Sequence, residues 1–299
     1  MKQHKRSRGA HGFMAMVTAA ALLSSVNSLE ANPYLEFLRS GTYERKIEAM
    51  LHLGYAGNKK AFWLMVKNLN VDDSEGRGSE RMAHLRSAAA EALGRLRDQR
   101  AVTFLVERYQ KEKSLRVKNS IVFSLGLLKD RRGYGVIENG LASGETELVI
   151  QSMRAAAMTS NADFIPKIKD AMSKSGDERA ALAGAYALVM MGDGIPENMN
   201  KLAAGLLSRD PVLRFWSAGY LTEAGRMEGL DPLLRAREIE STDWVRRQID
   251  TGINRLALVK KSFLEDASLG HLKDVKIESP AEEKKTPPGG VEKKPADKK

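Results

Sequence analysis

The sequence predicts an all-α superhelix, a solenoid of about six or seven helical hairpins. Three observations lead to this prediction. Apolar residues recur at helical spacing, this pattern itself recurs about every 32 residues, and turn-forming residues separate the copies. A fixed period of this length is typical of stacked units that bury one continuous core between them.

The clearest copy of the repeat spans residues 85–109. The apolar residues of its first half form one helical stripe: Leu85, Ala88, Ala89, Ala92, Leu93 and Leu96. After a turn that follows Gly94, a second stripe contains Val102, Leu105, Val106 and Tyr109. Steps of three and four residues place each set on one face of a helix. The unit is therefore predicted to be a hairpin of two helices whose apolar faces turn inward.

One anchor position identifies the other copies. It holds Leu53, Leu93, Leu125, Ala157, Leu188, Leu221 and Ile253. The steps between these anchors are 40, 32, 32, 31, 33 and 32 residues. The long first step contains a polar, glycine-rich insert at residues 71–79, which predicts a loop. Asp210 and Pro211 open the sixth copy as an N-cap and a first helical residue.

The motifs LRSAAAEALGRL at 85–96 and DPVLRFWSAGYL at 210–221 resemble bacterial HEAT-like repeats, the short variety also found in phycocyanobilin-lyase-type proteins. The resemblance covers residues 42–260 and implies an α-solenoid. It also implies that recurring basic and acidic residues brace successive hairpins. These residues would be Arg86, Asp98, Lys118, Asp130, Asp193, Arg214 and Arg246. The sixth copy departs from the pattern, because Arg226 stands where the acid is expected.

The two ends of the chain differ from the repeats. Residues 1–31 combine a basic start with an apolar run and predict a cleaved signal peptide, with an uncleaved membrane anchor as the alternative. Residues 32–41 are expected to cap the repeat domain at 42–267. Residues 268–299 form a Lys- and Pro-rich tail that is expected to be disordered. The absence of cysteine excludes disulfides and thiolate metal sites.

The positive charge of the chain is spread rather than concentrated. Of the formal net charge of +10, residues 1–31 carry +3 and residues 273–299 carry +2, which leaves +5 for the repeats. This argues against nucleic acid as the partner. The second helices are expected to line the concave side, and their basic residues would form a stripe there: Lys60, Lys67, Arg108, Lys111, Arg132, Lys167, Lys169, Lys201, Arg235 and Arg237. The alternative is an ordinary solvated surface.

No catalytic constellation is evident in the sequence. His52, His84 and His271 follow no metal-binding spacing, so neither a catalytic residue nor a metal or cofactor site is predicted. Trp63, beside Phe62, is a candidate contact residue at one end of the solenoid. Trp216 is expected to pack in the core.

These observations favour an exported, non-catalytic scaffold that binds a protein or peptide along the concave face. The partner-binding candidates are Lys60, Trp63, Lys67, Arg108, Lys111, Arg132, Lys167, Lys201 and Arg235. One alternative is a binder of anionic polymers or lipid headgroups at the cell envelope. Another, which the resemblance implies, is an accessory to an enzyme. The oligomeric state stays open.

Overall fold

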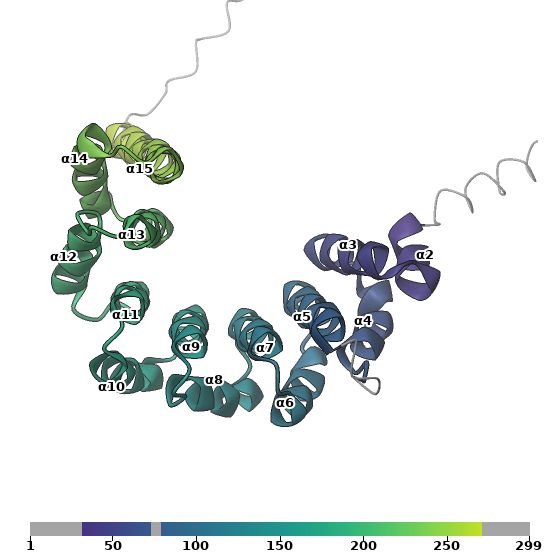
Figure 1. Ribbon diagram of the computed structural model, residues 1–299. Coiled ribbons are helices and arrows are strands. Elements are labelled where there is room, and N and C mark those ends of the chain that lie inside the picture. The colour runs from purple at the N-terminus through teal and green to yellow at the C-terminus, as the bar shows by residue number, and fades with distance from the viewer. Residues whose placement is uncertain (1–31, 73–78, 271–299) are drawn as a thin grey trace, which may run out of the picture.

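A computed structural model describes residues 32–72 and 79–270, and every regular element in these ranges is a helix. A short helix, α2 (Pro33–Ser40), precedes the repeats. The first helices of the units are α3 (Tyr43–Tyr55), α5 (Ser79–Arg95), α7 (Leu115–Leu128), α9 (Thr146–Thr159), α11 (Glu178–Met190), α13 (Pro211–Ala224) and α15 (Asp243–Gly270). The second helices are α4 (Phe62–Leu69), α6 (Ala101–Lys111), α8 (Tyr134–Leu141), α10 (Ile165–Ser175), α12 (Ile195–Gly205) and α14 (Leu230–Ile239). The predicted all-α solenoid is confirmed (Figure 1).

Side-chain caps set where the helices begin. Asp210 accepts a hydrogen bond from the backbone N–H of Val212 at 2.8 Å, with Pro211 in the first helical turn, as the sequence predicts. Asp177 caps α11 in the same way through Arg179 N at 2.7 Å. Such caps satisfy N–H groups that have no partner within the helix. They fix the residue at which α11 and α13 begin.

The anchor residues lie in the core. Leu53, Leu93, Leu125 and Leu221 are at most 1% exposed, whereas Ile253 in the last helix is partly buried. The repeat register derived from the sequence is therefore correct, and among the anchors only Ile253, in the last described helix, is less buried.

Successive first helices pack closely because small residues stand between them. A Cβ atom on Gly94 would lie 2.5 Å from the Cβ of Ser124 in α7. A Cβ atom on Gly126 would lie 2.8 Å from the Cα of Ala155 in α9. Both positions need a glycine, because real Cβ atoms do not approach so closely. The first helices thus form the more tightly spaced of the two layers.

This difference in spacing sets the direction of curvature. The units follow an arc, with the first helices on its inner side and the second helices on its outer side (Figure 1). The expectation that the second helices line the concave side is therefore wrong. In a curved stack the inner layer has the shorter spacing, and here that is the layer rich in alanine and glycine.

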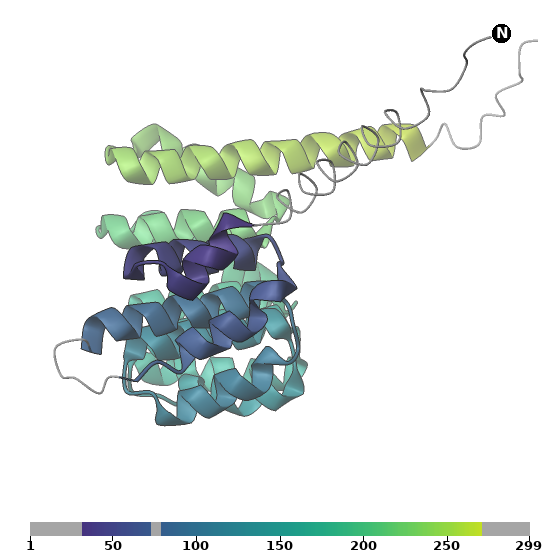
Figure 2. The ribbon, with the colours of Figure 1, turned by 90° about the vertical axis from the view of Figure 1, so that its right-hand side faces the viewer.

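The last described helix, α15, lies at the C-terminal end of this arc. Figure 2 shows the helices of the stack lying side by side, with α15 running well past the others. In the ranges that the structure describes, no helix has both the length and the apolar character that a membrane crossing requires. The predicted signal peptide, most of the insert at 71–79 and nearly all of the tail lie outside the described residues.

Candidate functional site

The concave face is the exposed surface of the first helices. Neighbouring first helices cover the flanks of each first helix and second helices cover its outer side, so its remaining side faces the inside of the arc. Many side chains on this side of the first helices are large and partly or largely exposed: Tyr55, Arg95, Phe123, Leu127, Arg154, Met190 and Trp216. The face thus carries aromatic, methionine and arginine side chains on six of the first helices, α3 to α13.

Arg95 connects three helices at the N-terminal end of this face. Its guanidinium lies 4.0 Å from the ring centroid of Tyr55 in α3 and 5.4 Å from that of Phe123 in α7. Its Nη2 also pairs with Glu91, one turn earlier in α5, at 2.8 Å. Arg95 is therefore held by cation–π contacts and by an ion pair at the same time.

Three stacked rings occupy the face further along the chain. The ring centroids of Tyr186 in α11 and Tyr220 in α13 are 4.8 Å apart, with planes at 18°. Trp216 stacks on Tyr220 at 5.8 Å and 30°. The two tyrosines are 8% and 3% exposed, whereas Trp216 is 38% exposed. The expectation that Trp216 packs in the core is therefore wrong, because it forms the open end of the stack.

A charged pair lies beside this stack. Nη2 of Arg154 in α9 is 3.8 Å from Oε2 of Glu223 in α13, so the pair passes across α11, which stands between these two helices in the arc. Nε of Arg154 is buried and has no hydrogen-bond partner. Burial, followed by the nearby Glu223 charge, raises the pKa of Tyr186. Burial also raises the pKa of Tyr220 to about 12, while Arg154 acts in the opposite direction.

The predicted basic stripe lies on the outer, convex side, since its residues belong to the second helices and their 3-10 turns. Several members pair with acidic neighbours: Arg108 with Glu112, Arg132 with Asp130, Lys167 with Glu138, Lys169 with Asp193, Lys201 with Glu197 and Arg237 with Asp250. Exposed side chains make up the rest of the candidate set: Lys60, Trp63, Lys67, Lys111 and Arg235. The structure thus does not gather these residues in a concave groove.

The predicted ladder contains two strong braces, but their acidic partners differ from the expected ones. Arg86 donates from Nε and Nη2 to the Glu112 carboxylate at 2.9 and 3.1 Å, and Arg86 is 1% exposed. Arg214 binds Glu240 through the same two nitrogens at 2.7 and 2.9 Å. Both acids stand directly after a second helix, 26 residues beyond their arginine. The arginine therefore ties its hairpin to the loop that opens the next one.

The other ladder residues make weaker or more local contacts. Asp98 and Asp130 pair with Arg100 and Arg132, two residues further on, at 2.7 Å each. Asp193 pairs with Lys169 of the previous unit at 2.7 Å. Of the remaining members, Lys118 lies over the ring of Tyr109 at 5.5 Å and Arg246 donates to the Glu240 carbonyl at 3.0 Å. A regular ladder of basic and acidic residues is therefore absent from the described part of the solenoid.

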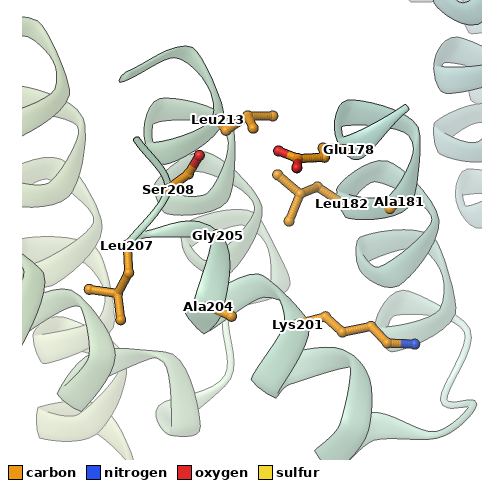
Figure 3. A pocket seen from close by; sticks show the side chains of 9 residues that line it. All are labelled: Glu178, Ala181, Leu182, Lys201, Ala204, Gly205, Leu207, Ser208 and Leu213. Carbon is orange, nitrogen blue, oxygen red and sulfur yellow. The ribbon is translucent and has the colours of Figure 1, made fainter. Parts of the chain in front are cut away.

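A pocket lies in a unit that lacks the brace between an arginine and a glutamate. In the fifth unit Ala181 and Leu207 replace the arginine and the glutamate. They line a cavity of about 390 Å³ between α11, α12 and α13, with Leu182, Leu213, Glu178 and Lys201 around it (Figure 3). The missing salt bridge thus leaves an apolar recess. No group of three or more metal-ligating side chains occurs among the residues that the structure describes.

One family model and one solved structure agree with this architecture. The family model described as the PBS lyase HEAT-like repeat matches residues 85–111. No curated protein matches the chain. Among solved structures, the complex of CpcE and CpcF of phycocyanin lyase from Nostoc sp. PCC7120 is similar, with 19% identity and a TM-score of 0.56 over 75% of this chain and 93% of that chain. Human deoxyhypusine hydroxylase in complex with glycerol has 16% identity and a TM-score of 0.36, over 79% of this chain and 88% of that chain. Residues 85–111 thus match a HEAT-like repeat, and the chain has the fold of a HEAT-like solenoid.

Proposed function

We propose that this protein is an exported, non-catalytic scaffold that binds a protein or peptide along the concave face formed by its first helices. The composition of that face is the observation that carries the proposal. Tyr55, Phe123, Met190 and Trp216 are exposed or half-buried along the arc, among arginines. Aromatic residues, methionine and arginine are enriched in protein interfaces, and aromatic and arginine side chains dominate their binding energy.

The rigidity of the concave face also favours binding. Arg95 is fixed between two rings, and the Trp216 ring is supported by Tyr220. Side chains that are already ordered lose little entropy when a partner binds, which raises affinity at a given contact area. The similar phycocyanin lyase structure is a complex of two subunits, CpcE and CpcF, so this fold is compatible with a protein partner.

Site-specific photo-cross-linking tests the proposal. A photoreactive amino acid replaces Phe123 or Trp216 on the concave face, and in matched controls Lys111 or Lys167 on the outer helices. We expect the two concave positions to give adducts with one and the same protein, and the outer positions to give few. Equal yields of the same adduct from the inner and outer positions would contradict the proposed face.

The export component of the proposal is supported by the basic and apolar pattern of residues 1–31. We expect intact-mass analysis of the exported protein to show an N-terminus near Leu29 or Asn32. Recovery of the full-length chain fixed in the membrane would instead support the anchor.

A further inference from the structure

Three consecutive hairpin turns carry an excess of positive charge. They are residues 56–60, 96–100 and 129–132, and each joins a first helix to the second helix of the same unit. The turns hold two acidic residues and seven basic ones, a net charge of +5, which is as large as the surplus of the whole repeat region. All seven basic residues are exposed, and we call this set the basic edge: Lys59, Lys60, Arg97, Arg100, Lys129, Arg131 and Arg132.

Contacts between units hold these turns side by side. Gln99 donates a hydrogen bond to the Leu128 carbonyl at 2.9 Å, and the Arg100 guanidinium lies 4.3 Å from the centroid of the Phe62 ring. Two of the seven cations pair with the acid of their own turn, and the other five form no ion pair with any residue that the structure describes. The three hairpin turns that follow along the chain hold one basic and three acidic residues. The fold thus concentrates on one edge a charge that is spread along the sequence.

The backbone of two of these turns favours glycine, yet a basic residue stands there. The fourth residue after the anchor has a positive φ in five units, and in three of them it is a glycine: Gly57, Gly192 and Gly225. Arg97 and Lys129 occupy the same position of the second and third units, with φ of 53° and 55°. A residue with a side chain is strained in this left-handed conformation, and such strain is concentrated at functional positions. The fold therefore tolerates strain at two positions that each place a cation on the basic edge.

An exposed aromatic residue lies beside the basic edge. Trp63, in the first turn of α4, is 62% exposed. Its ring contacts those of Phe62 and Phe104, with centroid distances of 5.0 and 5.7 Å, so its base is held by packing. A tryptophan ring suits the boundary between water and lipid, because it is apolar and carries one polar N–H group.

We propose that the basic edge binds the surface of a membrane that contains anionic lipids, with the Trp63 ring at the level of the headgroups. An exposed ion pair with a single acidic group contributes little, whereas an anionic bilayer attracts all cations of the edge together. Because α15 runs past the other helices on the side where the first helices end, the solenoid meets the membrane at an incline, with units one to three nearest to it (Figure 2). This edge is separate from the concave face, so neither proposal depends on the other.

Co-sedimentation of the full chain with mixed vesicles of phosphatidylglycerol and phosphatidylcholine measures this binding. We expect binding to increase with the phosphatidylglycerol content and to decrease as the salt concentration rises, because salt screens exposed charges. Residues 1–31 are the same in every variant, so differences between variants report on the basic edge.

The double variant Arg97→Gly with Lys129→Gly removes two cations without adding strain. Glycine adopts a positive φ readily, so the midpoint of urea unfolding should stay the same or rise. Binding that depends on phosphatidylglycerol should weaken by about tenfold or more, since each cation near an anionic bilayer contributes to the attraction. The matched control is Lys111→Gln with Lys113→Gln, which removes two exposed cations from the opposite edge, where α6 leads into α7. We expect this control to bind almost normally.

Lipids with brominated acyl chains test the position of Trp63, because bromine quenches the fluorescence of a tryptophan close to it. We expect quenching in the wild type and in Trp216→Phe, whose substitution lies on the concave face, but not in Trp63→Phe.

Three results would overturn the membrane assignment: equal losses of binding in the two double variants, binding that does not increase with phosphatidylglycerol, or quenching that persists in Trp63→Phe. Tighter binding to soluble polyphosphate or RNA than to vesicles, at equal phosphate concentration, would identify a soluble polyanion as the ligand and would overturn it too.

Discussion

At the scale of single residues, the buried pair of Arg86 and Glu112 should be the most sensitive to substitution. Both side chains are at most 2% exposed, and the Glu112 carboxylate also accepts hydrogen bonds from Arg108 and from the backbone N–H of Ser114. Arg86→Met leaves a buried carboxylate without its main partner, so we expect it to cost about 3–5 kcal/mol. Urea unfolding measures this loss. The exposed Arg100→Ala should leave the unfolding midpoint unchanged, and an equal loss in both variants would contradict the assigned burial.

The same carboxylates predict a dependence of stability on pH. Burial alone would raise the pKa of Glu112, but hydrogen bonds from Arg86, Ser114 and Arg108 outweigh it and lower the pKa from 4.5 to about 2. Hydrogen bonds from Arg214 lower the pKa of Glu240 to about 2 as well, against its burial. A lowered pKa stabilises the folded state above pH 4.5, and this contribution is lost as the pH falls towards 2. Thermal unfolding between pH 6 and 2.5 should show this loss, and Glu240→Gln should reduce its slope.

The residue scale also shows how far the sequence alone leads. The resemblance to HEAT-like repeats implied the bracing role of Arg86 and Arg214, which stand seven positions before the anchors Leu93 and Leu221. Their acidic partners could not be recognised from the sequence, because Glu112 and Glu240 lie 26 residues further along the chain, beyond a whole second helix. The corresponding positions of the intermediate copies hold other residues. The signal that was available is local: both acids directly follow the last residue of a second helix. Arg154 and Glu223 have no sequence signal, since the curvature of the stack brings them together.

At the scale of helices, the contact between α7 and α9 depends on Gly126. An alanine there would place its Cβ 2.8 Å from the Cα of Ala155, and backbone atoms cannot move aside cheaply. We expect Gly126→Ala to cost about 1–3 kcal/mol through overpacking. Gly135 in α8 is the matched control, since a Cβ there meets nothing within 4 Å. Gly135→Ala should stabilise the protein by about 0.4–1 kcal/mol in the same denaturation assay, because it restricts the unfolded chain.

Hairpins and their register are predictable from the sequence because apolar spacing and caps act within one unit. Which layer of helices faces the inside of the arc is not predictable in this way, because it depends on the difference in spacing between the two layers, added up over many units. Alanine and glycine in 85–96 indicate that first helices approach closely, and this property places them on the inner side of the arc. For this reason the basic stripe lies on the face opposite to the predicted one, although it does belong to the second helices and their 3-10 turns.

At the scale of the whole molecule, the solenoid behaves as a chain of nearest-neighbour contacts, so the position of a unit determines the effect of a core substitution. Leu125 lies in α7, is 1% exposed and has first helices packed on both sides, α5 and α9. Leu125→Ala should therefore cost about 2–5 kcal/mol. Ile253 belongs to the last helix and is only partly buried, so Ile253→Ala should cost clearly less.

Hydrogen exchange distinguishes how these two losses spread through the solenoid. Leu125→Ala weakens the contacts of α7 with its neighbours, so amides from α5 to α9 should exchange faster together. Ile253→Ala should accelerate exchange in α15 and α14 and leave α7 protected, because few contacts reach beyond adjacent units. Uniform acceleration over all helices in both variants would mean that the solenoid unfolds in one step. In that case the concave face would open and close as a whole, and a partner bound to one unit would stabilise every other unit equally.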